Sequence, residues 1–148
     1  MRKIVLISCV SKKLDHPARA EELYTSTLFK YGLKYAKSFN PDRIFILSAK
    51  YGLVSSDKII APYNKTLNDM SSKENIKWSN KVLEDLKKVC DLDNDQVIFL
   101  AGENYRKYLL PHIKNYAIPM KGLGIGRQLK YLKDKTSKSS SIKQTRLM

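Results

Sequence analysis

The sequence predicts a single three-layer α/β domain with a mainly parallel sheet of about four strands. Four short segments rich in β-branched and aromatic residues are almost continuously apolar, as expected for strands covered on both faces of a sheet. Segments with helical spacing alternate with them, which is typical of right-handed crossovers between parallel strands. With 148 residues, 43% of them hydrophobic, the chain can build one core.

The predicted elements follow in chain order. Strands are expected over residues 3–9, 43–48, 96–101 and 116–120, and helices over residues 21–37, 72–89, 103–114 and 125–133. Asn40 and Pro41 end the first helix, and Ser71 or Ser72 caps the second, with Glu74 in its first turn.

The charge balance indicates a polyanionic partner. The chain has 28 Lys and Arg residues against 14 Asp and Glu residues, a net charge of +14, which attracts nucleic acid or anionic lipid. We rank nucleic-acid contact above a merely solubilising surface. Residues 134–148 hold four basic residues and one acidic residue without apolar periodicity, so they predict a disordered basic tail behind a domain of residues 1–133.

Several classes of protein do not fit the sequence. No stretch approaches the roughly 20 apolar residues of a membrane helix, and the N-terminus does not read as a signal peptide, so we expect a cytoplasmic protein without membrane contact. Cys9 and Cys90 are far apart and outside any zinc-binding pattern, which predicts no disulfide framework and no metal site. We also expect no bound cofactor, because the glycines near residue 124 match neither a dinucleotide fingerprint nor a Walker motif.

Polar and glycine-rich loops follow each predicted strand. In open α/β sheets the ligand crevice lies at the carboxyl ends of the strands, so these loops are expected to face one crevice. Hydroxyls, cationic groups and glycine N–H groups suit a phosphate, and a base stacked on tyrosine gains about 1–3 kcal/mol. The candidate nucleic-acid or nucleotide-binding residues are Ser8, Ser11, Lys12, Lys13, Ser48, Lys50, Tyr51, Tyr63, Gly102, Tyr105, Arg106, Gly124, Gly126 and Arg127.

Plainer interpretations of the same loops stay open. The lysines after the first strand also fit a solvated basic turn, and a lone tyrosine is more often packed against a sheet. The glycines from residue 122 to 126 also fit a tight connection that needs glycine dihedrals.

One carboxylate among cationic groups and tyrosines points to cleavage of an N-glycosidic bond. A hydrolase with a serine, histidine and acid triad is not indicated, because neither histidine lies beside a candidate nucleophile. The carboxylates within reach are Asp15, Asp57 and Glu103. Asp57 is the candidate catalytic residue, because it lies between Tyr51 and Tyr63 in the sequence and is expected to fold back over the crevice. The alternative is that Asp57 closes a turn and that Glu103 only begins a helix.

Taken together, the loops resemble the domain-of-unknown-function 6884 family over nearly the whole body of the chain. The matching segments are Ser8-Cys9-x-Ser11-Lys12-Lys13, Leu23-Tyr24-x-Ser26, Leu47-Ser48-Ala49-Lys50-Tyr51-Gly52-Leu53, Pro62-Tyr63-x-x-Thr66-Leu67, Leu100-Ala101-Gly102-x-x-Tyr105 and Gly122-Leu123-x-Ile125-Gly126-x-Gln128-Leu129.

A more remote similarity is to the peroxide-stress YaaA proteins. It rests on Ile7-Ser8, Ser48, Tyr51-Gly52-Leu53, Asp57, Ile60 and Pro62-Tyr63, whereas Asn64 replaces an arginine of their pattern. These resemblances imply an α/β domain and, on the YaaA side, DNA binding with a link to damaged or modified bases.

Two classes of function therefore remain. One is a protein that binds nucleic acid or a nucleotide, DNA being favoured over RNA, with N-glycosidase-like activity on modified nucleobases. The other is a non-catalytic basic DNA-binding or stress-response module.

Overall fold

The computed structural model describes the backbone of residues 1–147 and the side chains of residues 1–137. Within these residues, five strands form one sheet in the order β4-β3-β1-β6-β7. Its strands are β1 (Lys3–Ser8), β3 (Arg43–Ser48), β4 (Gly52–Ser55), β6 (Gln96–Leu100) and β7 (Tyr116–Ala117). Only β4 runs antiparallel to its neighbour. The two-residue strands β2 (Ala18–Arg19) and β5 (Ile59–Ile60) pair with each other outside this sheet.

The core is centred on β1, which is paired on both edges and covered on both faces. Ile4, Val5 and Leu6 are completely buried although successive residues point to opposite faces. A strand in this position must be apolar throughout, which explains why the strand segments lack polar alternation.

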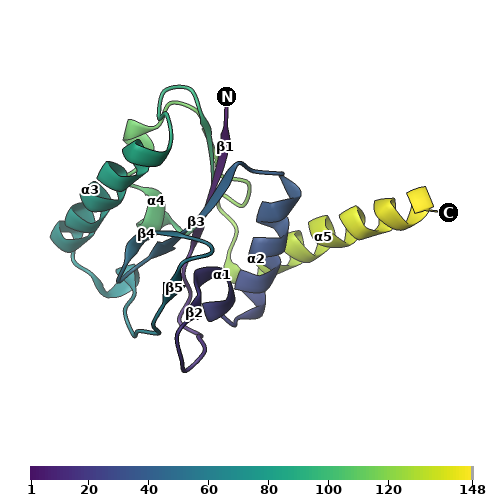
Figure 1. The fold of residues 1–148 in the computed structure, drawn as a ribbon, viewed down its shortest axis with the longest axis horizontal. Coiled ribbons are helices and arrows are strands. Elements are labelled where there is room, and N and C mark those ends of the chain that lie inside the picture. Colours follow the sequence, from purple (N-terminus) through teal and green to yellow (C-terminus); the bar gives the residue numbers. More distant parts are fainter. Residues whose placement is uncertain (148) are drawn as a thin grey trace.

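Helices lie on both sides of the sheet. In Figure 1, α3 (Ser72–Val89) lies on one side, while α2 (Thr27–Ser38) and α5 (Ile125–Leu147) lie on the other. The hydroxyls of Tyr35 and Tyr131 are 2.9 Å apart and join α2 to α5. Shorter helical pieces are α1 (Ala20–Leu23), α4 (Glu103–Arg106) and the 3₁₀ turns Leu67–Asp69 and Leu110–His112.

The α/β class and the mostly parallel sheet are confirmed. Helix α3 has the predicted bounds, and Ser71 caps it by accepting the N–H of Glu74 while the Glu74 carboxylate accepts the N–H of Ser71. Strand β4 is an addition, because the segment after residue 51 folds back as a hairpin on β3. Gly52, with φ of +74°, allows that reversal.

Two predicted helices are interrupted. The helix predicted over residues 21–37 breaks at Tyr24, whose backbone is extended and forms a bridge with Lys13, and Ser26 then caps α2. The helix predicted over residues 103–114 ends at Arg106, and the chain continues into the 3₁₀ turn Leu110–His112, which contains Pro111.

The helix α5 continues beyond residue 134, where the sequence predicts the start of a disordered tail. Thr136 is buried and its hydroxyl donates to the carbonyl of Leu132, so residues 134–137 are part of the folded unit, contrary to that boundary. Residues 138–148 lie outside the described side chains, and the prediction of a loose tail over them stays a prediction.

Asp95 links the residue that precedes β1 to the segment that precedes β6, so a substitution of Asp95 tests the fold. Its buried carboxylate accepts the backbone N–H groups of Asp91 at 2.8 Å and Arg2 at 2.9 Å, and these bonds lower its pKa below the ordinary value of 3.8. We expect Asp95→Ala to lower the free energy of unfolding by about 1–3 kcal/mol at neutral pH, because it leaves these donors without an acceptor.

The pH dependence has a defined sign. Because the folded pKa is depressed, this stabilisation is complete above pH 3.8 and is lost as the pH falls through the lower folded value. Urea unfolding at several pH values should show the gap between wild type and Asp95→Ala closing in acid. An equal stability of the two proteins at pH 7 would contradict the role assigned to Asp95.

Candidate functional site

The carboxyl ends of β1, β3 and β6 lie at one edge of the sheet. The three strands are parallel and in register, so Ser8, Ser48 and Leu100 end at similar heights. The chain leaves β1 to form β3 on one side and later returns to form β6 on the other. The space between the carboxyl ends of β1 and β6 is therefore a topological switch point, where open α/β sheets bind ligands.

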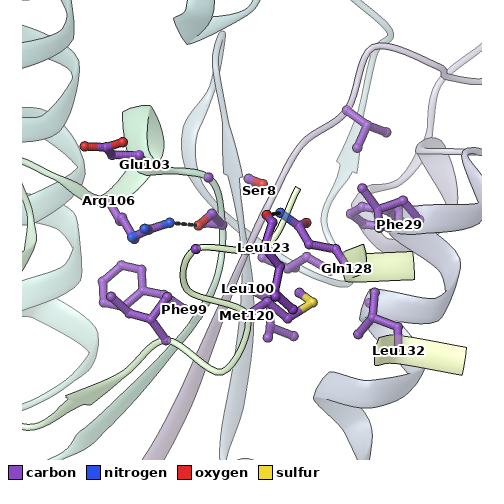
Figure 2. Close-up of a pocket in the computed structure, with 18 residues that line it drawn as sticks. Ser8, Phe29, Phe99, Leu100, Glu103, Arg106, Met120, Leu123, Gln128 and Leu132 are labelled. Atoms are coloured by element: carbon purple, nitrogen blue, oxygen red, sulfur yellow. Dashed lines mark hydrogen bonds between the residues drawn. The ribbon is translucent and has the colours of Figure 1, made fainter. Parts of the chain in front are cut away.

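A cavity of about 240 Å³ opens at this edge, between β1, β6, α2 and α5. Figure 2 shows Glu103 and Arg106 on one side of it, Phe29 and Leu132 on the other, and Ser8 and Gln128 between them. We call this cavity the edge pocket. Its other lining residues are Ile7, Val10, Leu28, Gly32, Phe99, Leu100, Ala101, Gly102, Ile118, Met120, Gly122 and Leu123.

Two polar side chains of the edge pocket are held by backbone carbonyls. The guanidinium of Arg106 donates to the carbonyl of Ala101 at 2.7 Å, and the amide of Gln128 donates to the carbonyl of Leu123 at 2.8 Å (Figure 2). Among the described residues, neither Glu103 nor Arg106 takes part in an ion pair. The positive charge of Arg106 is therefore not neutralised by a carboxylate within residues 1–137.

Three of the predicted glycines are required by neither backbone conformation nor packing. The backbone at Gly122 has φ of +81°, a conformation that favours glycine, whereas φ is not positive at Gly102, Gly124 or Gly126. A Cβ atom at any of these three positions would meet no heavy atom within 4 Å. Gly102 and Gly122 line the edge pocket, whereas Gly124 directly precedes α5 and Gly126 lies in its first turn. Without a Cβ, the backbone at Gly102, Gly124 and Gly126 is open to a ligand.

A chain of hydroxyl groups lies at the end of β3. Ser48 is fully buried and donates to the Tyr63 hydroxyl at 2.8 Å, which lies 2.7 Å from the Tyr24 hydroxyl. Burial raises the pKa of Tyr24 to about 12 and also raises the pKa of Tyr63. These phenols therefore keep their protons at neutral pH, and the chain is a hydrogen-bonded frame rather than a base.

Lys13 and Tyr105 belong to the same frame. The Lys13 ammonium lies 4.5 Å from the centre of the Tyr63 ring, and burial lowers the pKa of this lysine. The buried Tyr105 accepts the Cys9 thiol at 3.4 Å and the N–H of Leu67 at 3.3 Å. The structure thus uses both predicted binding residues in contacts within the protein.

A base cannot lie between Tyr51 and Tyr63, the two tyrosines predicted to stack on one, in this geometry. The two rings meet edge to face, with centroids 5.6 Å apart, which leaves no room for a ring between them. Lys13 lies over the ring of Tyr63, while Tyr51 is 37% exposed.

The expectation that Asp57 folds back over the crevice is wrong. Strand β4 pairs Ser55 with Phe45, and Ser56 donates its N–H to Ile44, so Asp57 lies near the amino end of β3. Asp57 is therefore separated from Ser48 by the length of β3, roughly 16 Å. The exposed carboxylate accepts the Ser55 hydroxyl at 2.7 Å, and this bond lowers its pKa, as expected for a residue that closes a turn.

The remaining predicted residues divide by position. Ser8, Gly102 and Arg106 line the edge pocket. Arg127 is exposed at the start of α5, whereas Ser11 and Lys12 lie exposed in the loop after β1 and Lys50 lies at the turn after β3. Phe29 and Leu132 also line the edge pocket and were not predicted, because the apolar face of a helix carries no signal that part of it borders a pocket.

The described residues contain neither a metal-binding cluster nor a membrane-spanning helix. No group of three or more His, Cys, Asp or Glu side chains there is placed to hold a metal ion. No helix in the described part of the chain is long and apolar enough to cross a membrane.

Comparisons with known proteins place the chain in a family. It is 28% identical over 116 residues to the uncharacterized protein YfjM of Bacillus subtilis (strain 168). The aligned region covers 74% of this chain and 75% of that protein. No solved structure matches it. The remoter similarity to YaaA proteins stays a prediction. Residues 4–134 match the family of unknown function DUF6884, and the chain therefore belongs to the domain-of-unknown-function 6884 family.

Proposed function

We propose that this three-layer α/β domain binds one nucleoside or nucleotide unit, free or within a nucleic acid, in the edge pocket. The observation that supports this most is the combination at the switch point of an apolar floor with the Arg106 guanidinium, which has no ion-pair partner among the described residues, and the open backbone at Gly102. Gly124 and Gly126 lie in the sequence between the lining residues Leu123 and Gln128, and their backbone is equally open. The net charge of +14 favours the same class of ligand.

The size and chemistry of the pocket fit a single unit. A volume of about 240 Å³ lies below the roughly 300–1,000 Å³ of common ligand sites, which favours one base with its sugar over a dinucleotide. Phe29, Phe99 and Met120 offer apolar surface to a base. Arg106 and the first N–H groups of α5 offer positive charge to a phosphate.

Glu103 takes the catalytic role that the sequence analysis gave to Asp57. Among the described residues it is the one carboxylate that lines the edge pocket. In an N-glycosidic cleavage, the bond between the sugar carbon and the base nitrogen breaks, water adds its oxygen to the sugar carbon, and the base receives a proton. A carboxylate at the rim stabilises the positive sugar in the transition state or orients the water.

The competing function is a non-catalytic basic module that binds DNA. The hydroxyl frame of Ser48, Tyr63 and Tyr24 supports it, because these groups satisfy one another and supply no base to a reaction. In that case the edge pocket holds a nucleotide unit without breaking a bond.

The first test compares Glu103→Gln with Asp57→Asn. Both substitutions remove one exposed carboxylate, but only Glu103 borders the edge pocket. We expect wild type and Asp57→Asn to release base from nucleosides or from DNA with modified bases at equal rates, and Glu103→Gln to be at least about 100-fold slower. Chromatography of the free base measures the release.

The outcomes separate the two functions. Nucleoside binding in a calorimetric titration without any base release would favour the non-catalytic module. The absence of nucleoside and nucleotide binding would refute the pocket proposal, and equal release by Glu103→Gln would refute the role of Glu103.

The second test uses Gly126→Ala. Because the added Cβ meets no neighbour and alanine favours helix, we expect the free energy of unfolding to rise by up to about 1 kcal/mol. If a phosphate approaches this backbone, the variant should bind a nucleoside monophosphate several-fold more weakly while its affinity for the nucleoside is unchanged. Unchanged affinity for both ligands would mean that no phosphate lies against Gly126.

A further inference from the structure

A second hollow, of about 450 Å³, lies along the first half of α3 beside the turn after β3. We call it the lysine groove, and its cationic and aromatic lining residues are Lys50, Lys65, Lys77, Lys81, Tyr51 and Trp78. The lysine groove and the edge pocket share no lining residue. In Figure 1, α3 lies on the side of the sheet opposite α2 and α5, which line the edge pocket.

The positive charge of the lysine groove is largely uncompensated. Lys81 pairs with Asp85 at 3.0 Å, but among the described residues Lys50, Lys65 and Lys77 form no ion pair. These three side chains are exposed. The groove contains one carboxylate, Glu74, which is already engaged in capping α3 through Ser71. Several unpaired ammonium groups around one hollow favour a ligand with repeated negative charges.

Two aromatic rings provide flat surface within this positive field. The half-buried Trp78 is held in place, because its indole N–H donates to the carbonyl of Ser48 at 2.9 Å and its ring meets Tyr105 edge to face. Tyr51 is 37% exposed, and the Lys50 ammonium lies 5.2 Å from its ring centre. Rings beside ammonium groups are the elements with which proteins hold unpaired bases and their phosphates.

From these observations we infer that the lysine groove binds the backbone and unpaired bases of a single-stranded nucleic acid. Paired bases are stacked inside a duplex and cannot reach Tyr51 or Trp78, whereas bases of a single strand can. An acidic peptide would satisfy the lysines but would leave the aromatic surface unused. The inference takes from the proposed function only the class of partner, and it assigns that partner a surface outside the edge pocket.

The test measures binding of a fluorescent single-stranded oligonucleotide of mixed sequence at several salt concentrations. The variant Lys50→Gln/Lys65→Gln/Lys77→Gln is compared with Lys30→Gln/Lys34→Gln/Lys37→Gln, which removes the same charge from exposed lysines of α2 on the opposite side of the sheet. Each lysine that neutralises a phosphate of a single strand contributes about 0.7 to the slope of log affinity against log salt concentration. We therefore expect the groove variant to lose about 2 from that slope and the α2 variant to lose much less.

Tyr51→Leu tests the stacking without a change of charge. We expect it to weaken binding of the single strand between about fivefold and a hundredfold and to leave binding of a matched duplex unchanged. Thermal melting of each variant shows whether it is folded.

The inference is overturned if the groove variant keeps the wild-type slope, if the α2 variant loses as much, or if the duplex binds as tightly as the single strand and responds equally to Tyr51→Leu. Titrations with mononucleosides test the edge-pocket proposal separately. The groove variant should bind mononucleosides as tightly as wild type does.

Discussion

The burial of β1 on both faces is the constraint on which the rest of the structure depends. This strand pairs with β3 on one edge and with β6 on the other, and helices lie on both sides of the sheet, so every residue between Lys3 and Ser8 is buried and apolar. Because its neighbours are parallel to it, the chain must cross over twice. The loops that follow β1, β3 and β6 therefore meet at the same end of the sheet.

That end of the sheet separates its polar groups into two sets with different roles. Ser48, Tyr63 and Tyr24 are too enclosed for water to satisfy them, so they bind one another, and among the described side chains no buried nitrogen or oxygen lacks a partner. Arg106 and the backbone of Gly102 line the edge pocket, and among the described residues Arg106 has no ion-pair partner. The first set fixes the loops, and the second set is available to a ligand.

The features that could be predicted from the sequence are those with a local signal. The helical periodicity of residues 72–89 predicted the bounds of α3, and the apolar segment of residues 43–48 predicted the bounds of β3. The loops at the carboxyl ends of the strands predicted Ser8 and Arg106, which line the edge pocket. The position of Asp57 depends on whether residues 52–55 pair with β3, which no local pattern decides. The bond between Tyr24 and Tyr63 joins residues 39 positions apart and likewise needed the fold.

The most direct measurement of the central claim, a nucleotide site at the edge pocket, is a nuclear magnetic resonance titration of ¹⁵N-labelled protein with a nucleoside monophosphate. The account predicts that amide signals of Gly102, Gly124 and Gly126 and the side-chain amide of Gln128 shift in a saturable way, while those around Asp57 stay fixed. No shift in the first set, or shifts confined to the turn around Asp57, would contradict it.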